Sequence, residues 1–247
     1  MFDHVAIRVG DLAAATRFYD LALDAIGFGG ERFVGALGVE WDDFAIAPAA
    51  AQHRATRGLH LGFAAPSRAH VDAFWTALTG AGYTDDGAPG PRPRYRDDYY
   101  GAFVLDPDGN SVEAVHHEAV GRDAGAIDHI WLRTPDVSAA RRFYDTIAPV
   151  VGIALRRDDP DWAAFGFRDG RGSFSFVSGG KPTEHVHLAF GVADDATVDE
   201  FHRVALAAGY RDNGTPGERP EYHAGYYGAF VSDPDGHNVE AVCHNRN

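Results

Sequence analysis

The stretch YYGAFVLDPDGNSVEAVHH at residues 99–117 returns as YYGAFVSDPDGHNVEAVCH at residues 226–244, with fifteen of nineteen positions identical. In both copies DPDG predicts a tight turn, because Pro fixes φ early in a turn and Gly tolerates the left-handed position at its end. The turn joins two strand-like segments into a predicted β-hairpin. The return strand carries a carboxylate among apolar residues, Glu113 in one copy and Glu240 in the other. Such a carboxylate is costly to bury unless it is paired or metal-bound.

Two further pairs of segments extend the repeat along the chain. FDHVAIRVGDLAAATRFYD (2–20) matches IDHIWLRTPDVSAARRFYD (127–145) at ten of nineteen positions, and LHLGFAAPSRAHVDAF (59–74) pairs with VHLAFGVADDATVDEF (186–201). A length of 247 residues also suits two domains. We therefore predict two copies of one domain, residues 1–118 and 126–247, joined by a small, polar linker near the segment EAVGRDAGA.

Each copy contains a fainter half-repeat. A short alternating strand with one histidine precedes a helix-like run that carries aromatic residues, as in DHVAIRV followed by FYDLALDAIGF, and several strand-like stretches follow. This order is read as βαβββ. The predicted fold class is α+β, with four βαβββ modules that form two open, barrel-like domains.

Composition narrows the range of partners. The formal net charge of −14 disfavours nucleic acid, whose phosphates such a surface repels. The single cysteine, Cys243, allows no intrachain disulfide and fits a reducing compartment. The N-terminal segment lacks the basic region of a secretory signal, and no run approaches the roughly 20 apolar residues of a membrane span. We expect a cytoplasmic protein with a small-molecule substrate and no nucleic-acid or membrane partner.

Strand alternation places the histidines opposite the most apolar face. In DHVAIRV the residues Val5, Ile7 and Val9 share one face, and His4 lies on the other beside small residues. The same holds for His60 in LHLGF. Each copy therefore offers two histidines and one glutamate on strands, namely His4, His60 and Glu113, then His129, His187 and Glu240. Two imidazoles and one carboxylate with open positions suit Fe(II), and also Mn(II), Ni(II), Co(II) or Zn(II).

A plainer interpretation exists for each histidine. A single strand histidine is more often a hydrogen-bonded core residue than a metal ligand. Here the segments around His4 and His129 differ at nearly half of their positions, yet both copies keep all three ligand types. The repetition therefore favours metal binding at one or both sites.

These modules and motifs resemble the vicinal oxygen chelate superfamily, which includes glyoxalases, bleomycin-resistance proteins, fosfomycin-resistance enzymes and extradiol dioxygenases. The resemblance rests on the histidine of DHVAIRV, the histidine of LHLGF and the glutamate of DPDGNSVE, and it covers nearly the whole chain. It implies two βαβββ modules that curve around one metal, with substrates bound through adjacent oxygens or an oxyanion stabilised by the metal.

The sequence also departs from members of that superfamily. Glyoxalase I uses a fourth ligand, a glutamate, on strands that correspond to DFAIAPA (43–49) and SFSFVSG (173–179), and neither carries one. Extradiol enzymes place a histidine and a tyrosine upstream of the ligand glutamate. His223 occupies the histidine position in the second copy, but Phe230 occupies the tyrosine position, and the first copy has Arg96 and Phe103.

Further candidates lie beside the hairpins. Alternation turns one residue of each pair, Tyr99–Tyr100 and Tyr226–Tyr227, toward the site, and we take Tyr100, Tyr227 and His223 as the catalytic candidates. His185 shares a face with His187 and is an alternative ligand, although the alignment of LHL with VHL favours His187. Two arginines in Arg-Pro dipeptides, Arg92 and Arg219, are either anion-binding groups or solvated loop residues.

The pairing of the four modules leaves two arrangements open. Either each copy closes on itself, or the first module of one copy pairs with the second module of the other. We expect the second arrangement, which groups His4 with His187 and Glu240, and His129 with His60 and Glu113. Such a chain is an internal pseudo-dimer that stays monomeric or forms a homodimer.

Three functional classes follow from the sequence. The first is a divalent-metal-dependent enzyme with glyoxalase-like lyase or isomerase chemistry, or extradiol-type dioxygenase chemistry. The second is a metal-free drug-binding protein that acts by sequestration, as bleomycin-resistance proteins do. The third is a partner-binding protein built on the duplicated scaffold. The complete ligand sets favour the first class.

Overall fold

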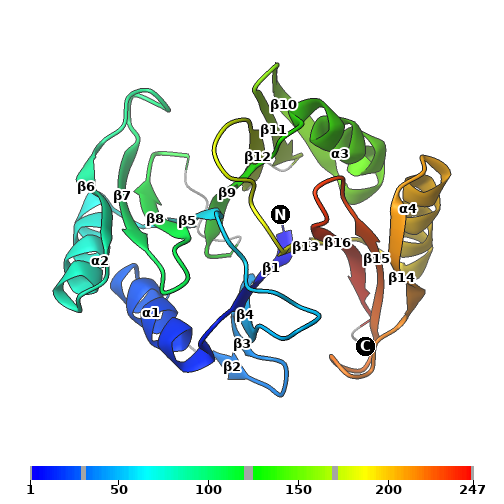
Figure 1. Cartoon of the computed structure of the whole chain (residues 1–247), viewed down its shortest axis with the longest axis horizontal. Coiled ribbons are helices and arrows are strands. Elements are labelled where there is room, and N and C mark those ends of the chain that lie inside the picture. Colours follow the sequence, from blue (N-terminus) through cyan, green and yellow to red (C-terminus); the bar gives the residue numbers. More distant parts are fainter. Residues whose placement is uncertain (1, 29–31, 120–124, 169–171, 246–247) are drawn as a thin grey trace. The chain divides into compact units, whose positions relative to one another are not determined.

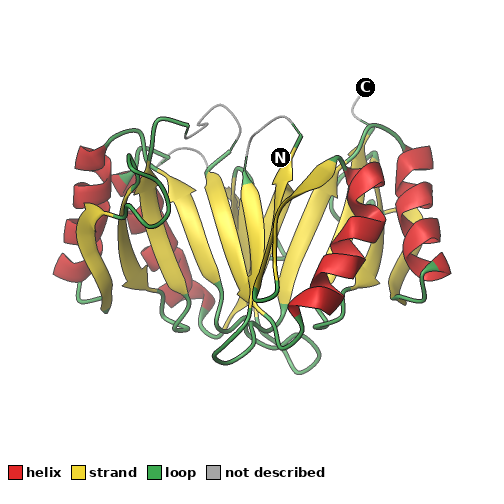
Figure 2. Ribbon diagram, turned by 90° about the horizontal axis from the view of Figure 1, so that it is seen from above, coloured by secondary structure: helices red, strands yellow, loops and turns green. Residues whose placement is uncertain are grey.

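The computed structural model of the chain describes residues 2–28, 32–119, 125–168 and 172–245 (Figure 1). Within these ranges the chain forms four helices and two eight-stranded sheets, which confirms the predicted α+β class. Figure 2 shows helices lying against strands that run beside them.

The elements follow the predicted βαβββ order four times. Each module has one strand, one helix and three further strands. The modules of the first repeat are β1 (Phe2–Val9), α1 (Leu12–Ala25), β2 (Phe33–Val34), β3 (Val39–Trp41) and β4 (Phe44–Pro48), then β5 (His60–Ala64), α2 (Arg68–Gly80), β6 (Asp85–Pro91), β7 (Tyr100–Leu105) and β8 (Ser111–His116). Those of the second are β9 (Ile127–Arg133), α3 (Val137–Val151), β10 (Ile153–Asp159), β11 (Trp162–Phe167) and β12 (Ser173–Val177), then β13 (Val186–Gly191), α4 (Asp195–Ala207), β14 (Arg211–Glu218), β15 (Tyr226–Ser232) and β16 (Asn238–His244).

Each sheet takes one module from each repeat. The strand order is β14-β15-β16-β13-β1-β4-β3-β2 in one sheet and β10-β11-β12-β9-β5-β8-β7-β6 in the other. The first strands of paired modules, β1 with β13 and β5 with β9, are therefore neighbours. This is the exchanged arrangement expected from the duplication.

The chain divides into two compact units, one of residues 1–5 and 133–247 and the other of residues 6–132. The domain boundaries predicted at 1–118 and 126–247 describe the sequence copies, and they stay a prediction. Residues 120–124 of the predicted linker lie outside the described residues.

Amphipathic helices cover the strands within each unit. In α1 the buried residues recur at helical spacing, Ala15, Phe18, Tyr19, Ala22 and Leu23, which gives the helix one apolar stripe. The helix begins at the N-cap Asp11, whose side chain accepts a hydrogen bond from the backbone N–H of Ala14. In the unit of residues 6–132, α1 packs against β4, and α2 packs against β6, β7 and β8. In the other unit α3 lies on β10–β12 and α4 on β14–β16.

The DPDG turns set the register of the hairpins that carry the glutamates. The Asp106 carboxylate accepts hydrogen bonds from the backbone N–H groups of Asp108 and Asn110, so the first aspartate of the motif closes the turn. Across β7 and β8 this register places Phe103 opposite Glu113. On its other side β8 runs parallel to β5, with Gly62 beside Glu113. In the second copy Phe230 lies opposite Glu240, and Ala189 takes the place of Gly62.

None of the helices in the described parts of the chain has both the length and the apolar character needed to cross a membrane.

Candidate metal centres

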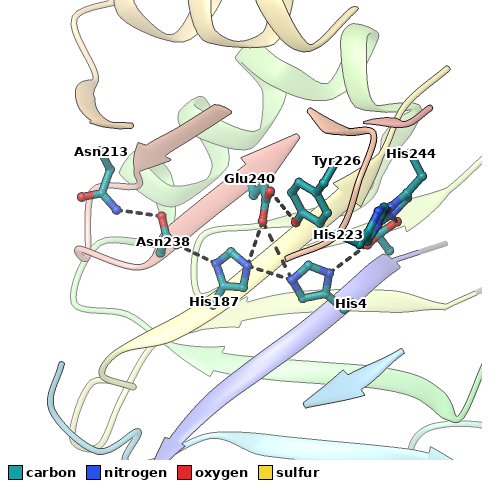
Figure 3. A network of polar contacts seen from close by, with 9 residues as sticks. His4, His187, Asn213, His223, Tyr226, Asn238, Glu240 and His244 are labelled. Atoms are coloured by element: carbon teal, nitrogen blue, oxygen red, sulfur yellow. Dashed lines mark hydrogen bonds and ion pairs between the residues drawn. The ribbon is translucent and has the colours of Figure 1, made fainter. Parts of the chain in front are cut away.

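Two histidine side chains converge on Glu240 in one unit (Figure 3). The Glu240 triad consists of His4 on β1, His187 on β13 and Glu240 on β16. The His187 Nε2 atom lies 3.1 Å from Glu240 Oε2 and 3.0 Å from His4 Nε2. The His4 Nε2 atom lies 3.9 Å from the same carboxylate oxygen. Two imidazole nitrogens and one carboxylate oxygen therefore face a common point.

The other unit repeats this geometry with its own three residues. The Glu113 triad consists of His60 on β5, Glu113 on β8 and His129 on β9. Glu113 Oε2 lies 3.0 Å from His60 Nε2 and 3.4 Å from His129 Nε2. In both triads the three candidate ligand atoms lie within 4.8 Å of one another. The grouping of His4 with the ligands of the second copy, and of His129 with those of the first, is the arrangement expected from the sequence.

A tyrosine fixes each buried carboxylate. Tyr226 donates a 2.7 Å hydrogen bond to Glu240 Oε1, and Tyr99 donates a 2.9 Å bond to Glu113 Oε1. Both glutamates are 1% exposed. In each triad the bond to Oε1 orients the carboxylate so that Oε2 points to the two imidazoles. A carboxylate that is held in this way is ready to coordinate a cation through one oxygen.

An aspartate holds the far side of one histidine in each triad. Asp3 lies 2.8 Å from His4 Nδ1, and Asp128 lies 2.8 Å from His129 Nδ1. A carboxylate accepts only, so each Nδ1 carries a proton, and in the neutral imidazole the Nε2 lone pair then faces the centre of the triad. This carboxylate–histidine pairing is the usual support of a metal-binding imidazole.

The remaining histidines are supported by different polar chains. His60 Nδ1 lies 3.2 Å from the Ser111 hydroxyl, which donates to Asp86 at 2.6 Å. At the Glu240 triad, His187 Nδ1 lies 2.7 Å from the side-chain amide of Asn238, and Asn213 contacts the same amide at 2.7 Å. Rotating both amides by 180° keeps these contacts and makes Asn238 an acceptor for an N–H at His187 Nδ1. Both chains are thus compatible with a free Nε2 lone pair.

The charges around the Glu113 triad favour a cation. Burial lowers the pKa of His129, but hydrogen bonds to Asp128 and Glu113 outweigh this and raise the pKa to about 10. Burial raises the pKa of Glu113, and hydrogen bonds to His129 and His60 reverse the effect, so this pKa lies below its ordinary value. Buried carboxylates therefore stabilise positive charge at the imidazoles, which is what a divalent ion would supply. The donor set and its electrostatics fit such an ion.

Glycines give the triads the room that they need. A Cβ atom on Gly62 would lie 2.6 Å from Nδ1 of His129, and one on Gly228 would lie 2.6 Å from Oε1 of Glu240. A Cβ atom on Gly101, the equivalent of Gly228 in the first repeat, would lie even closer to Oε1 of Glu113. The counterpart of Gly62 is Ala189, so the two triads differ at this position.

A phenylalanine and an arginine lie on one side of each triad. The Phe230 ring lies 6.2 Å from the His187 ring, and the Arg219 guanidinium lies 5.5 Å from the Phe230 centroid. Phe103 and Arg92 repeat this beside His60, at 5.8 and 5.4 Å. Both arginines are half-buried and also bond backbone carbonyls. Their positive charge at the edge of each site suits an anionic ligand.

The structure places two of the three predicted catalytic residues away from the triads. Tyr100 and Tyr227 do not lie at the triads, because their hydroxyls donate to Asp72 on α2 and Asp199 on α4. Strand alternation explains this, since the neighbouring residues Tyr99 and Tyr226 occupy the face of the glutamates.

His223 connects to the Glu240 triad through two other side chains (Figure 3). Its Nε2 lies 2.8 Å from His244 Nδ1, and His244 Nε2 lies 2.8 Å from Asp3, which holds His4. In the first copy the corresponding series of side-chain contacts ends at His117. This residue lies 3.3 Å from Asp128, and its Nδ1 is buried without a hydrogen-bond partner. Arg96, the counterpart of His223, pairs instead with Asp98.

Several residues that support the triads were not among those predicted from the sequence. Asp3, Asp128, His117 and His244 were not selected, although both copies carry an aspartate before the ligand histidine and a histidine four residues after the ligand glutamate. His185, the alternative ligand, lies outside both described clusters.

The sequence matches one family model twice. The model of the Glyoxalase/Bleomycin resistance protein/Dioxygenase superfamily covers residues 1–114 and again residues 126–241. The chain belongs to this superfamily. The resemblance drawn from the histidine and glutamate motifs is therefore confirmed. No curated protein matches this superfamily member in sequence.

Solved structures share the fold at low identity. Glyoxalase I from Zea mays is 19% identical with a TM-score of 0.68, over 98% of this chain and 92% of that chain. A glutamate-to-glutamine variant of that maize enzyme is 20% identical with a TM-score of 0.70, over 98% and 93%. A candidate dioxygenase from Bacillus subtilis is 14% identical with a TM-score of 0.65, over 100% and 86%. At these identities the likeness establishes the two-domain glyoxalase fold alone.

Proposed function

We propose that this protein is a divalent-metal-dependent enzyme that acts on a small oxygenated molecule, with one metal ion at each triad. The observation that carries the proposal is the convergence of two Nε2 atoms and one carboxylate oxygen within 4.8 Å, twice in one chain. Three protein ligands leave positions open for substrate oxygens, as catalytic metal sites require. Fe(II), Mn(II), Ni(II), Co(II) and Zn(II) all suit this ligand set.

The first experiment measures metal content. The purified protein is reconstituted with each of the five metals, desalted and analysed for bound metal. We expect about two equivalents in the wild type, about one in Glu113→Ala and in Glu240→Ala, and none in the double variant. Glu40→Ala is the control, because Glu40 is an exposed strand glutamate outside both triads. Wild-type protein that retains none of these metals would contradict the proposal and favour metal-free ligand sequestration.

A bound ion would supply Lewis-acid polarisation of substrate oxygens. The side chains around the triads would bind and orient the substrate. Arg219 and Arg92 lie at the edges of the two sites, where each guanidinium can hold an anionic group of the substrate. This supports a substrate that pairs metal-binding oxygens with a negative charge.

His223 and His244 support proton transfer at the Glu240 triad. His223 Nδ1 lies 2.8 Å from the Ala224 carbonyl and His244 Nε2 lies 2.8 Å from the Asp3 carboxylate, and both acceptors require a proton on the imidazole. The two rings contact each other at 2.8 Å, between His223 Nε2 and His244 Nδ1. We propose that this contact relays a proton for acid–base chemistry, with the half-buried His223 as its route to solvent.

A substrate screen would determine the reaction class. Catechols, adducts of 2-oxo-aldehydes, and 2-hydroxy or 2-oxo acids present adjacent oxygens to a metal. Screening them on the metal-loaded protein with oxygen uptake recorded separates dioxygenase chemistry, which consumes oxygen, from lyase or isomerase chemistry, which does not. From the sequence argument on Cys243, which is buried and unpaired, we also propose a cytoplasmic location.

A further inference from the structure

One large side chain beside the Glu113 triad has no counterpart at the Glu240 triad. Trp131 lies two residues after His129 on β9, whereas the residue two after His4 on β1 is Ala6. Residues two apart on a strand share a face, so Trp131 projects to the same side of the sheet as His129. The register of β5 with β9 places it opposite His60.

The indole stands at an angle to both imidazoles of the triad. Its ring centroid lies 6.0 Å from that of His60, with an interplanar angle of 68°, and 6.4 Å from that of His129, with an angle of 61°. The Tyr95 ring meets it edge to face at 5.6 Å and 85°. The Trp131 side chain is only half-buried. A flat group bound at the triad can therefore contact the exposed part of the indole.

We propose that Trp131 is a specificity-determining residue, which makes the Glu113 triad select ligands whose metal-binding oxygens are attached to a flat, conjugated group. Ala6 leaves the Glu240 triad without this preference. The inference rests on the proposed function, because a metal must hold the ligand oxygens. Offset or edge-to-face contact with an indole strengthens binding of such a group on the order of tenfold.

The alternative is that Trp131 only supports Tyr95 and the local packing. The two roles predict different results for a pair of ligands that share the same chelating atoms. Loss of packing weakens both ligands to a similar extent, whereas loss of an aromatic contact weakens only the flat one. Benzohydroxamate and acetohydroxamate form such a pair, since they present the same two oxygens and differ in a phenyl or a methyl group.

The experiment isolates one triad at a time. In a Glu240→Ala background, protein loaded with Ni(II) or Zn(II) is first assayed for metal content, and the Kd of each hydroxamate is then measured by calorimetry. We expect Trp131→Ala to reduce the preference for benzohydroxamate over acetohydroxamate roughly tenfold, with acetohydroxamate affinity changed less than twofold. Trp131→Leu keeps apolar bulk without the ring and should give the same result if Trp131→Ala does not fold. In a Glu113→Ala background, Ala6→Trp should create the preference at the other triad.

The outcomes separate the two proposals. Absence of metal from the Glu240→Ala protein contradicts the metal centre itself, and the inference falls with it. Retained metal with an unchanged ratio of the two affinities in Trp131→Ala and Trp131→Leu overturns the role of Trp131 alone, as does an equal loss for both ligands. A second readout is tryptophan emission, which Ni(II) bound at the Glu113 triad should quench in the Glu240→Ala protein and quench less after Trp131→Leu.

Discussion

The hydroxyl of Tyr226 donates a 2.7 Å hydrogen bond to Oε1 of Glu240, and it thereby turns the other oxygen of this buried carboxylate toward His4 and His187. Tyr99 does the same for Glu113. We expect Tyr226→Phe and Tyr99→Phe to weaken metal binding at their own triads about tenfold, because a supporting hydrogen bond of a metal ligand typically contributes this much. Competition with a chromophoric chelator measures the change.

The neighbouring tyrosines are matched controls for this prediction. Tyr227→Phe and Tyr100→Phe remove hydroxyls that bond to Asp199 and Asp72, away from the triads. Their metal affinities should equal that of the wild type. An equal loss in both members of a pair would contradict the assignment of Tyr226 and Tyr99.

Gly62→Ala should remove metal binding at the Glu113 triad. The added Cβ would lie 2.6 Å from Nδ1 of His129, so the imidazole must leave its position. Metal analysis in a Glu240→Ala background should give well under one equivalent, with the circular dichroism of the fold retained. The reverse change at the equivalent site, Ala189→Gly, should keep its metal and cost roughly 1 kcal/mol of stability. Full metal binding by Gly62→Ala would show that the imidazole can move and still coordinate.

Asp43 should make stability depend on pH. Its carboxylate accepts hydrogen bonds from the backbone N–H groups of Ala126 and Ile127. Burial nevertheless raises its pKa to about 7. The folded state therefore binds this proton more tightly than the unfolded state, whose pKa is near 3.8. The protonated Asp43 contributes fully to the free energy of unfolding below about pH 4. This contribution, on the order of 2–4 kcal/mol, is lost as the pH rises through 7.

Denaturant unfolding at pH 5 and pH 8 measures this effect. Asp43→Asn keeps an acceptor for the two N–H groups and removes the ionisation, so its stability should change less between the two pH values than that of the wild type. Glu40→Gln, at an exposed strand position, should behave as the wild type does. Identical pH profiles for Asp43→Asn and the wild type would refute the prediction.

His223→Gln should affect turnover more than Arg96→Gln. The imidazole of His223 contacts His244 and through it Asp3, whereas Arg96 pairs with the half-buried Asp98. With a substrate from the screen and saturating metal, we expect His223→Gln to lower kcat by roughly 10²-fold or more, as loss of an acid–base group does. Arg96→Gln should change kcat less than twofold, and metal content should stay constant in both. Equal effects of the two variants would remove His223 from the proton route.

Much of this architecture was predictable because period-2 alternation and the duplication constrain the same residues. The strand histidines and the hairpin glutamates were identified in this way. The exchange of modules between copies was expected from the duplication together with the resemblance to the superfamily. Which tyrosine of each pair faces the glutamate depends on register. The DPDG turn pairs Phe103 with Glu113, and odd-numbered residues back to Tyr99 then share its face. Counting from the turn would have selected Tyr99 and Tyr226 instead of Tyr100 and Tyr227.

Other features could not be read from local patterns. The hydrogen-bond chain from His4 through Asp3 and His244 to His223 joins residues from opposite ends of the sequence. They come together because β1 and β16 lie on either side of β13 in one sheet. The buried position of Asp43 likewise depends on the start of β9, more than eighty residues away. Such contacts are set by tertiary packing, which strand periodicity does not encode.

Each triad is completed by a histidine from the other sequence copy, since His4 joins His187 and Glu240, and His129 joins His60 and Glu113. In this topology a half-length ancestor would have completed a triad only by pairing with a second identical chain. After the fusion, a substitution in one half of the gene damages a centre whose other ligands are encoded in the second half. Selection on either centre therefore acts on both halves, and neither half is free to decay or to be inherited alone.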